Sequence, residues 1–409
     1  MPPSQTGSNP AETVRLSDAP QEPAPQEPAP VAPAPEDAPV RPGLRAAWPA
    51  VALYAALRFV GIAVAWAFAA DQHRSLLKLL GAYDAIWYAG IVQHGYDTAI
   101  PLKANGSPAT TNLAFFPFFP GLVAIVDPVL PGGADVAGIV VSWLAGLAAA
   151  WGLFAVGAFL RDRRTGIILA GVWAVLPHGF VESMGYTETL FTALAAWTLY
   201  ALLRRNWLTA GLLCMLAGLT RPTGSALIAV VGLTALIAVV QRRDGWRPWV
   251  AGVLSPLGFV GFFAFVGHRL GRADGYFHVQ NDAWKMSYDF GQNTIKTTHT
   301  LLTKPSALAL YVVALVVLIA AALLIILATD RVPWQLTAYS AIILALSFFG
   351  DSYYNSKARL LIPAFPLLLP VASGLARARR PIAVVVLGLL TVISALYGVY
   401  LSMVWTASP

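Results

Sequence analysis

The sequence predicts an all-α polytopic membrane protein with about 11 transmembrane helices. Of its 409 residues, 57% are apolar and 11% are charged, whereas a soluble domain carries about 25% charged residues. The apolar residues form long runs separated by short charged loops, the pattern of a chain that crosses a bilayer repeatedly. Runs such as 306–328 are continuously apolar rather than alternating, so we expect helices rather than barrel strands to span. This composition excludes a soluble enzyme.

The chain is expected to divide into a tail, residues 1–45, and a membrane domain, residues 46–409. The tail holds 12 of the 30 prolines. Because proline lacks a backbone donor and favours an extended chain, a disordered Pro/Ala-rich segment is expected. The first apolar run, 48–70, follows Arg41 and Arg45 and lacks an obvious cleavage site. We therefore predict a retained first helix and a cytoplasmic N-terminus.

Arginine residues indicate the orientation of the remaining helices. They cluster in short loops at residues 161–164, 204–205, 242–247, 331 and 377–380. Such clusters are typical of cytoplasmic loops, which predicts a multi-pass protein of the cell membrane with its acidic loops outside. The clusters beside apolar runs indicate membrane orientation rather than binding to a phosphate backbone, so membrane lipids are expected partners and nucleic acid is not.

Two outer loops are predicted to be long, 71–134 and 269–304. Within the first, the segment 113–130 is apolar but contains FFPFFP. Its two prolines break a helix, and its aromatic rings favour the membrane interface. If this segment crossed the bilayer, the arginines at 161–164 would lie outside. It is therefore predicted to be a re-entrant or interfacial segment.

An acidic residue follows the first predicted span in the stretch YDAIWYAGIVQHGYD. On a helix, the i, i+3, i+4, i+7 spacing places four side chains on one face: Asp84, Trp87, Tyr88 and Ile91. This pattern predicts an amphipathic helix in the first outer loop. Its carboxylate either serves chemistry or simply faces water from an interfacial helix with an aromatic belt.

Five short motifs occur in order between about residue 50 and residue 370. They are Tyr83-Asp84 with Trp87-Tyr88 and Gly95-Tyr96, the aromatic-proline segment 115–120, the segment 186–191, the segment 220–224, and the element 359–363 followed by Pro366. Together they resemble the motifs of the PIG-V family of mannosyltransferases, within the GT-C class of membrane glycosyltransferases. The sequence departs from that pattern in having Tyr rather than Trp before Asp84, and no aromatic residue directly after Arg359.

The resemblance implies a GT-C-like fold and an inverting glycosyltransferase, in particular a mannosyltransferase. The donor would be a polyprenyl-phosphate sugar, and the acceptor a hydroxyl of an extracytoplasmic glycan, glycolipid or protein. By the resemblance, Asp84 is the catalytic base. A single carboxylate suffices because the leaving group is already a stable phosphate, so no acid partner is needed. No cofactor is expected, and no metal, since no second carboxylate lies at DxD spacing near Asp84.

Two arginines are candidates to stabilise the departing phosphate. Arg221 lies in a Thr-Arg-Pro turn between two short apolar runs, where it could equally snorkel to lipid headgroups. Arg359 is expected to open a helix over 360–375, where it could equally pair with Asp351.

Further substrate-binding candidates are Tyr83, Trp87, Tyr88 and Tyr186, which belong to the motifs of the resemblance. Glu188 is a candidate to bind a sugar hydroxyl. It could equally stabilise the start of the next helix, where the dipole favours an acid. The same two roles apply to Glu182, for which the structural role is favoured.

Two other classes of function remain as alternatives. A transporter or flippase for a lipid-linked or polar solute usually places charges near the midplane and contains two repeated halves. No internal repeat is apparent, and the ionisable residues fall at helix ends. Arg58 is the exception, about ten residues into the first run, where a polar contact inside the helix bundle would accommodate it. A scaffold that binds partners through its Pro-rich tail would explain only residues 1–45.

Overall fold

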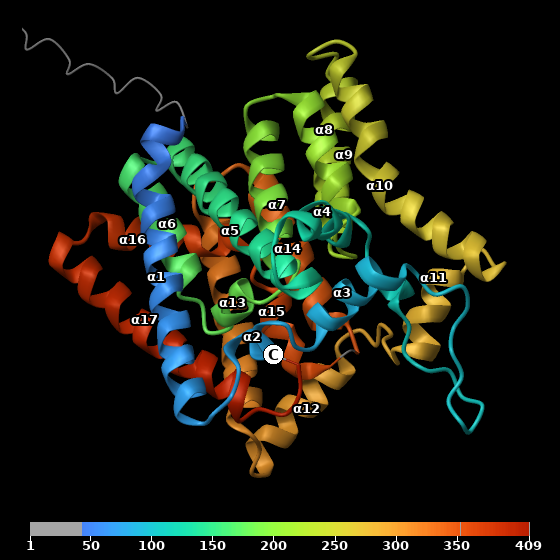
Figure 1. Cartoon of the computed structure of the whole chain (residues 1–409). Coiled ribbons are helices and arrows are strands. Elements are labelled where there is room, and N and C mark those ends of the chain that lie inside the picture. Colours follow the sequence, from blue (N-terminus) through green and yellow to red (C-terminus); the bar gives the residue numbers. More distant parts are fainter. Residues whose placement is uncertain (1–42, 352, 409) are drawn as a thin grey trace, which may run out of the picture. The chain divides into compact units, whose positions relative to one another are not determined.

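The computed structural model describes residues 43–351 and 353–408, and these form an all-helical membrane protein (Figure 1). The predicted tail, apart from its last three residues, lies outside this part of the chain. Five of the described helices are long and apolar enough to cross a membrane. They are α1 (Leu44–Asp71), α5 (Gly133–Leu160), α10 (Arg247–Leu270), α13 (Leu308–Thr329) and α17 (Arg380–Met403). The continuous apolar runs of the sequence produce all five.

The remaining helices are shorter. The apolar ones are α4 (Phe118–Val126), α7 (Glu188–Leu203), α8 (Trp207–Gly218), α9 (Gly224–Val240) and α14 (Trp334–Phe349). The others are α2 (Leu76–Leu80), α3 (Asp84–His94), α6 (Arg163–Ala174), α11 (Gly275–His278), α12 (Gln292–Thr303), α15 (Lys357–Leu360) and α16 (Leu369–Arg377). The all-α class is confirmed, whereas the count of about 11 spans stays a prediction.

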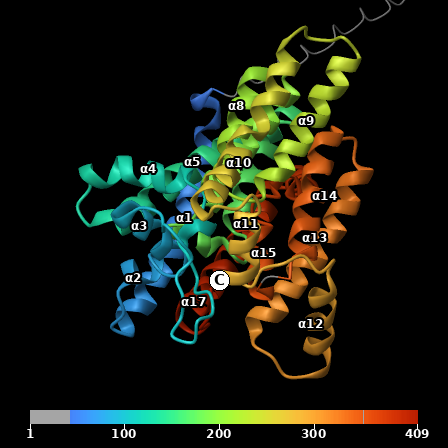
Figure 2. The ribbon, with the colours of Figure 1, turned by 90° about the vertical axis from the view of Figure 1, so that its right-hand side faces the viewer.

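The helices pack as a continuous series of neighbours. Helix α1 packs between α17 and α5, α5 packs on α7, α7 on α8, and α8 on α10 (Figure 1). Small residues permit the closest approaches: a Cβ on Gly157 of α5 would lie 2.7 Å from the Cα of Gly166 in α6. Helices α13 and α14 pack together, with α12 at one end of the pair (Figure 2).

The predicted helix over 360–375 is wrong as a single helix. The chain from Tyr354 to Leu360 and the chain from Phe365 to Arg377 are two pieces bent by 73°. Pro363 lies in the break and Pro366 follows it. Neither can donate a backbone hydrogen bond, so the helix cannot run through this segment. Arg359 therefore lies in the four-residue helix α15, ahead of the bend, instead of opening a span.

The segment 113–130, which includes FFPFFP, contains the short helix α4 of nine residues. At 1.5 Å per residue it is about 14 Å long, too short to cross the hydrocarbon core of a bilayer. The segment is fixed to the bundle by a hydrogen bond of 2.9 Å from the Phe118 amide to the carbonyl of Leu219. Its position relative to the membrane stays a prediction.

One arginine lies inside a spanning helix and is fully packed. Arg58 of α1 is 3% exposed, and its guanidinium donates to Ser183 Oγ and to the carbonyl of Ala174. The carboxyl group of Glu182 lies beside it, with Tyr54 and Glu188 as its other titratable neighbours. Glu182 lies in a 3₁₀ turn (Gly179–Ser183), not at an exposed helix start. Burial raises the pKa of Glu182 to about 8.

This pKa predicts that the protein loses stability between mildly acidic and mildly alkaline pH. Glu182 has its proton in the folded state up to about pH 8, whereas in an unfolded chain it releases the proton near its ordinary pKa. Its contribution is therefore fully present below that ordinary pKa and is lost as the pH rises through about 8. We expect the midpoint of thermal unfolding in detergent to fall from pH 5 to pH 8.5 for the wild type. The fall should be smaller for Glu182→Gln.

Asp71→Asn, which removes an exposed carboxylate at the end of α1, is the matched control and should retain the full pH dependence. An equal fall in Glu182→Gln and in the wild type would contradict the assignment.

Candidate active site

Four segments that are far apart in the sequence meet at one cluster of charged side chains. Asp84 is the first residue of α3, Glu188 is the first residue of α7, Arg221 lies in the turn between α8 and α9, and Arg359 lies in α15. Each side chain is thus placed by a helix end, where the chain changes direction. The structure brings together the predicted base, both predicted arginines and the predicted glutamate.

The four charges alternate in sign along a chain of contacts. Arg359 Nη1 donates to Asp84 Oδ2 over 2.8 Å, and Arg359 Nε lies 3.4 Å from Glu188 Oε1. The same Glu188 oxygen lies 2.5 Å from Arg221 Nη1. Arg359 therefore does not pair with Asp351, which accepts instead from Ser287 Oγ. We call this set of four the charge ladder.

Burial within the charge ladder is uneven. The side chain of Glu188 is 1% exposed and those of both arginines are 10% exposed, whereas the side chain of Asp84 is 26% exposed. Two arginines and the start of α7 stabilise the negative charge of Glu188, which has no water contact. Glu188 thus fixes the arginines, and Asp84 is the carboxylate that an incoming molecule can reach.

Two tyrosines connect the ladder to the protein around it. Tyr186 Oη accepts a hydrogen bond of 3.3 Å from the Asp84 amide, and its ring lies 5.2 Å below the Arg359 guanidinium carbon. Tyr88 Oη donates to Thr187 Oγ1 over 3.4 Å, and Arg221 Nη1 donates to the same oxygen over 3.2 Å. These contacts place both residues beside the charged groups.

Tyr83 and Trp87 lie near the ladder without contacting its charges in the described structure. Tyr83 has φ of 56° and ψ of −115°, a strained backbone for a residue with a side chain, directly before Asp84. It lines a cavity of about 90 Å³ next to Met184. Trp87 stacks on Phe115 with 5.7 Å between ring centroids and meets the edge of Trp284 at 5.3 Å.

Sequence reasoning missed several groups at the site. Ser408 places Oγ 3.5 Å from Arg359 Nη1, and its carbonyl accepts from Asn355 Nδ2 over 2.6 Å. His178 is 2% exposed and lies near Arg359, and its pKa is lowered to about 3 by burial and by that arginine. Its imidazole is therefore neutral. Nothing in the local sequence connects residues 178 or 408 with residue 359.

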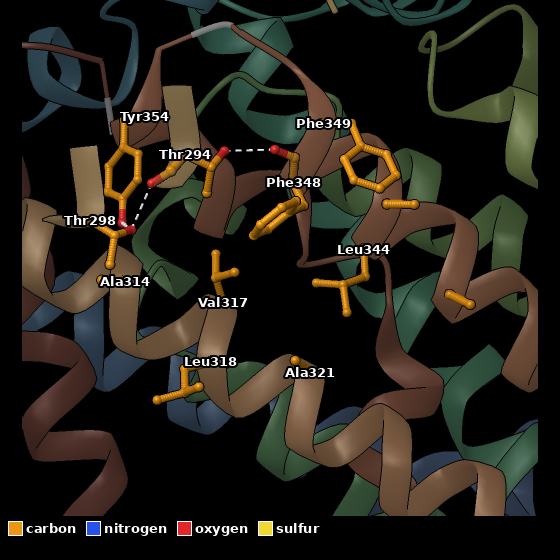
Figure 3. Close-up of a pocket in the computed structure, with 12 residues that line it drawn as sticks. Thr294, Thr298, Ala314, Val317, Leu318, Ala321, Leu344, Phe348, Phe349 and Tyr354 are labelled. Atoms are coloured by element: carbon orange, nitrogen blue, oxygen red, sulfur yellow. Dashed lines mark hydrogen bonds between the residues drawn. The ribbon is translucent and has the colours of Figure 1, made fainter. Parts of the chain in front are cut away.

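An apolar pocket of about 460 Å³ lies between α12, α13 and α14 (Figure 3). Its walls are mostly aliphatic and aromatic, including Val317, Leu344 and Phe348. At one end are the hydroxyl groups of Thr298 and Tyr354, 3.0 Å apart. Tyr354 begins the 3₁₀ turn (Tyr354–Ser356) that leads directly into α15 and Arg359. Tyr354, which lines the pocket, therefore lies five residues before Arg359 in the chain.

Among the described residues, no three His, Cys, Asp or Glu side chains are grouped so that they could hold a metal ion. Two are close: His278 Nδ1 and Asp282 Oδ2 contact each other from positions four apart. The described site presents one accessible carboxylate beside two buried cations. That arrangement can accept a proton and stabilise an anion.

The Glu188–Arg221 pair generates a testable prediction. We expect Glu188→Gln and Arg221→Gln each to lower the free energy of unfolding in detergent by about 3–5 kcal/mol, because each leaves a buried charge without its nearest partner. The double variant should lose less than the sum, by about 1–3 kcal/mol. The control is the exposed pair Arg272–Asp274, for which no coupling is expected. Strict additivity for Glu188 and Arg221 would contradict the ladder.

Comparison with known proteins places the fold. No protein-family model and no curated protein sequence matches the chain. Among solved structures, ArnT from Cupriavidus metallidurans bound to undecaprenyl phosphate superposes with a TM-score of 0.52 at 16% identity, covering 82% of this chain and 62% of ArnT. The apo form of the same protein gives 0.46 at 16% identity, covering 71% of this chain and 54% of that one.

The oligosaccharyltransferase of Archaeoglobus fulgidus gives a TM-score of 0.43 at 13% identity, covering 85% of this chain and 56% of that one. In the match to ArnT bound to undecaprenyl phosphate, the present chain spans about three fifths of the length of ArnT. The match to ArnT bound to undecaprenyl phosphate shows that the chain shares the fold of that protein, and it confirms the all-helical membrane fold that the sequence predicts.

Proposed function

We propose that this protein is an inverting glycosyltransferase of the PIG-V type, which transfers mannose from a polyprenyl-phosphate donor to a hydroxyl group outside the cytoplasm. The observation that carries the proposal is the contact between the accessible Asp84 carboxylate and the buried Arg359 guanidinium. The motifs shared with the PIG-V family also support it, because their charged residues converge in the charge ladder. The acceptor would be a glycan, a glycolipid or a protein.

The proposed reaction needs one base and one anion site. The acceptor oxygen attacks the anomeric carbon, the bond from that carbon to the phosphate oxygen breaks, and Asp84 takes the acceptor proton. Polyprenyl phosphate leaves with the electron pair of the broken bond and gains negative charge. Arg359 and Arg221 would stabilise that charge more strongly in the transition state than in the bound donor.

The contact between Asp84 and Arg359 also suggests how the base becomes free. Arg359 Nη1 donates a hydrogen bond to Asp84 Oδ2 over 2.8 Å. A phosphate that binds this nitrogen would compete with the Asp84 oxygen for its N–H group. Arg359 keeps its second contact, to Glu188, so the guanidinium stays in place during the exchange. Donor binding would thus release Asp84 toward the acceptor.

The apolar pocket supports a lipid-linked donor. Its volume of about 460 Å³ and its aliphatic walls suit several isoprene units, and Tyr354 at its polar end lies five residues before Arg359 in the chain. The structural neighbour ArnT is bound to undecaprenyl phosphate. Transferred to this chain, such a lipid would place its tail against α13 and α14, and its phosphate at the charge ladder.

Replacement of Asp84 tests both roles of its carboxylate. We expect Asp84→Asn to lower the turnover of synthetic polyprenyl-phosphate-mannose, in the presence of a membrane extract as acceptor, by on the order of 10²–10⁴-fold. Undecaprenyl phosphate should bind this variant more tightly than the wild type, because the amide competes less well for Arg359. The release of polyprenyl phosphate and equilibrium binding in nanodiscs are the measurements. Asp71→Asn should behave as the wild type, and normal turnover in Asp84→Asn would overturn the mechanism.

The side of the membrane on which the site lies is tested by labelling. In a Cys214→Ala background, which removes the buried free cysteine, Asp84→Cys should react in intact cells with a maleimide that cannot cross the membrane. Arg243→Cys, beyond the opposite end of α9 from Arg221, should react only after the cells are opened. Labelling of position 84 only in opened cells would remove an outward-facing donor site.

A further inference from the structure

Arg58 is a buried cation for which the proposed reaction has no direct use. It lies in the middle of the spanning helix α1, 3% exposed, and does not contact the charge ladder in the described structure. An ionisable group inside a membrane span is costly and is retained only with defined partners. Its contacts therefore indicate what the chain uses it for.

The guanidinium of Arg58 holds both ends of one short segment. Its Nη1 donates over 3.2 Å to the carbonyl of Ala174, the last residue of α6. Its Nε and Nη2 donate to Ser183 Oγ over 3.2 Å and 2.7 Å. A Cβ on Gly179, between these ends, would lie 3.0 Å from Nη1. One side chain thus fits closely into the bend of the segment 174–183.

That segment leads directly to the charge ladder. The residues after Ser183 are held by the carbonyl of Leu80, which accepts from the Gly185 amide, and by Ser142 Oγ, which donates to the Tyr186 carbonyl over 2.8 Å. Tyr186 and Glu188 follow within five residues and contact Asp84 and both arginines. A shift at Ser183 would therefore reach the ladder through a short, fully buried stretch of backbone.

A second set of contacts leads from the same face of α1 to Arg359. The ring of Tyr54, one helical turn before Arg58, stacks on Trp173 with centroids 5.2 Å apart. The indole of Trp173 donates over 3.1 Å to the carbonyl of Ile362, three residues after Arg359. Helix α1 therefore supports two of the segments that carry the charge ladder. It contacts the segment before Glu188 through Ser183, and the segment after Arg359 through Trp173 and Ile362.

We propose that Arg58 is a positioning residue, which holds the segment 174–183 so that Tyr186 and Glu188 keep Arg359 and Asp84 in register. The role in turnover rests on the proposed glycosyltransferase function, whereas the role in ordering the segment does not. Because small displacements of a reacting group cost up to about 10²-fold in rate, loss of Arg58 should act mainly on kcat.

The test compares five variants of the full-length protein in nanodiscs: Arg58→Lys, Arg58→Gln, Ser183→Ala, the double variant Arg58→Gln/Glu182→Gln, and Arg161→Gln. The last is the matched control, an arginine paired with Asp330 at the far end of α5 from Ser142. For each we would measure kcat and KM with polyprenyl-phosphate-mannose and the membrane extract, the midpoint of thermal unfolding, and hydrogen exchange of residues 178–188.

We expect Arg58→Gln to lower kcat by about 10–100-fold with little change in KM, and to speed hydrogen exchange in 178–188. Arg58→Lys keeps the positive charge but loses the paired hydrogen bonds to Ser183 Oγ. This variant and Ser183→Ala should therefore lower kcat less than Arg58→Gln does. In the double variant, Glu182→Gln removes the carboxyl group that would carry an unpaired buried charge above about pH 8. Its unfolding midpoint at pH 8.5 should therefore exceed that of Arg58→Gln, while kcat stays low. Arg161→Gln should have the kcat of the wild type.

Recovery of kcat together with the unfolding midpoint in the double variant would show that Arg58 only stabilises the fold, and would overturn the proposal. Unchanged hydrogen exchange in Arg58→Gln would overturn it as well. If the wild type does not consume polyprenyl-phosphate-mannose, the glycosyltransferase proposal fails, and the exchange data still decide whether Arg58 orders the segment.

Discussion

The site depends on the ion pairs that the buried Glu188 carboxylate makes with Arg221 and Arg359. The Glu188 side chain is 1% exposed and lies within ion-pair distance of two arginines that come from other parts of the chain. Burying any one of these three charges alone would be very unfavourable, and together they offset one another. The start of α7, the turn before α9 and the short helix α15 must therefore meet at one point, and Asp84 joins them through Arg359. The contacts that bring the four charged side chains together thus also hold these helix ends against one another.

The sequence predicted the long helices well because their cause is local. The runs 48–70 and 306–328 correspond to α1 and α13 within a few residues, since a continuous apolar segment needs no distant partner to form a spanning helix. The prediction of one helix over 360–375 failed because Pro363 and Pro366 interrupt the apolar run near its start.

The charged contacts were only partly predictable, because their partners are distant in sequence. Spacing alone suggested Asp351 for Arg359, eight residues away, whereas the structure pairs it with Asp84, 275 residues away. The motifs identified Asp84, Glu188 and both arginines as candidates without indicating that they touch. For Arg58 the sequence predicted a polar contact inside the bundle, and Ser183 and Ala174 provide it. Its link to the site appears only when the intervening backbone is followed.

The Asp84–Arg359 pair gives one interaction two consequences. While Asp84 Oδ2 accepts the hydrogen bond from Arg359 Nη1, that oxygen is occupied by the guanidinium. In the proposed mechanism, a phosphate that binds Arg359 would take over this contact and leave the Asp84 oxygen free to accept a hydrogen bond from the acceptor hydroxyl. In that proposed mechanism, Asp84 would be free to meet the acceptor only once the donor is bound. Glu188, with no access to water, cannot exchange in this way. The difference in burial thus separates the two carboxylates: Glu188 pairs with both arginines away from solvent, whereas Asp84 is open to an incoming molecule.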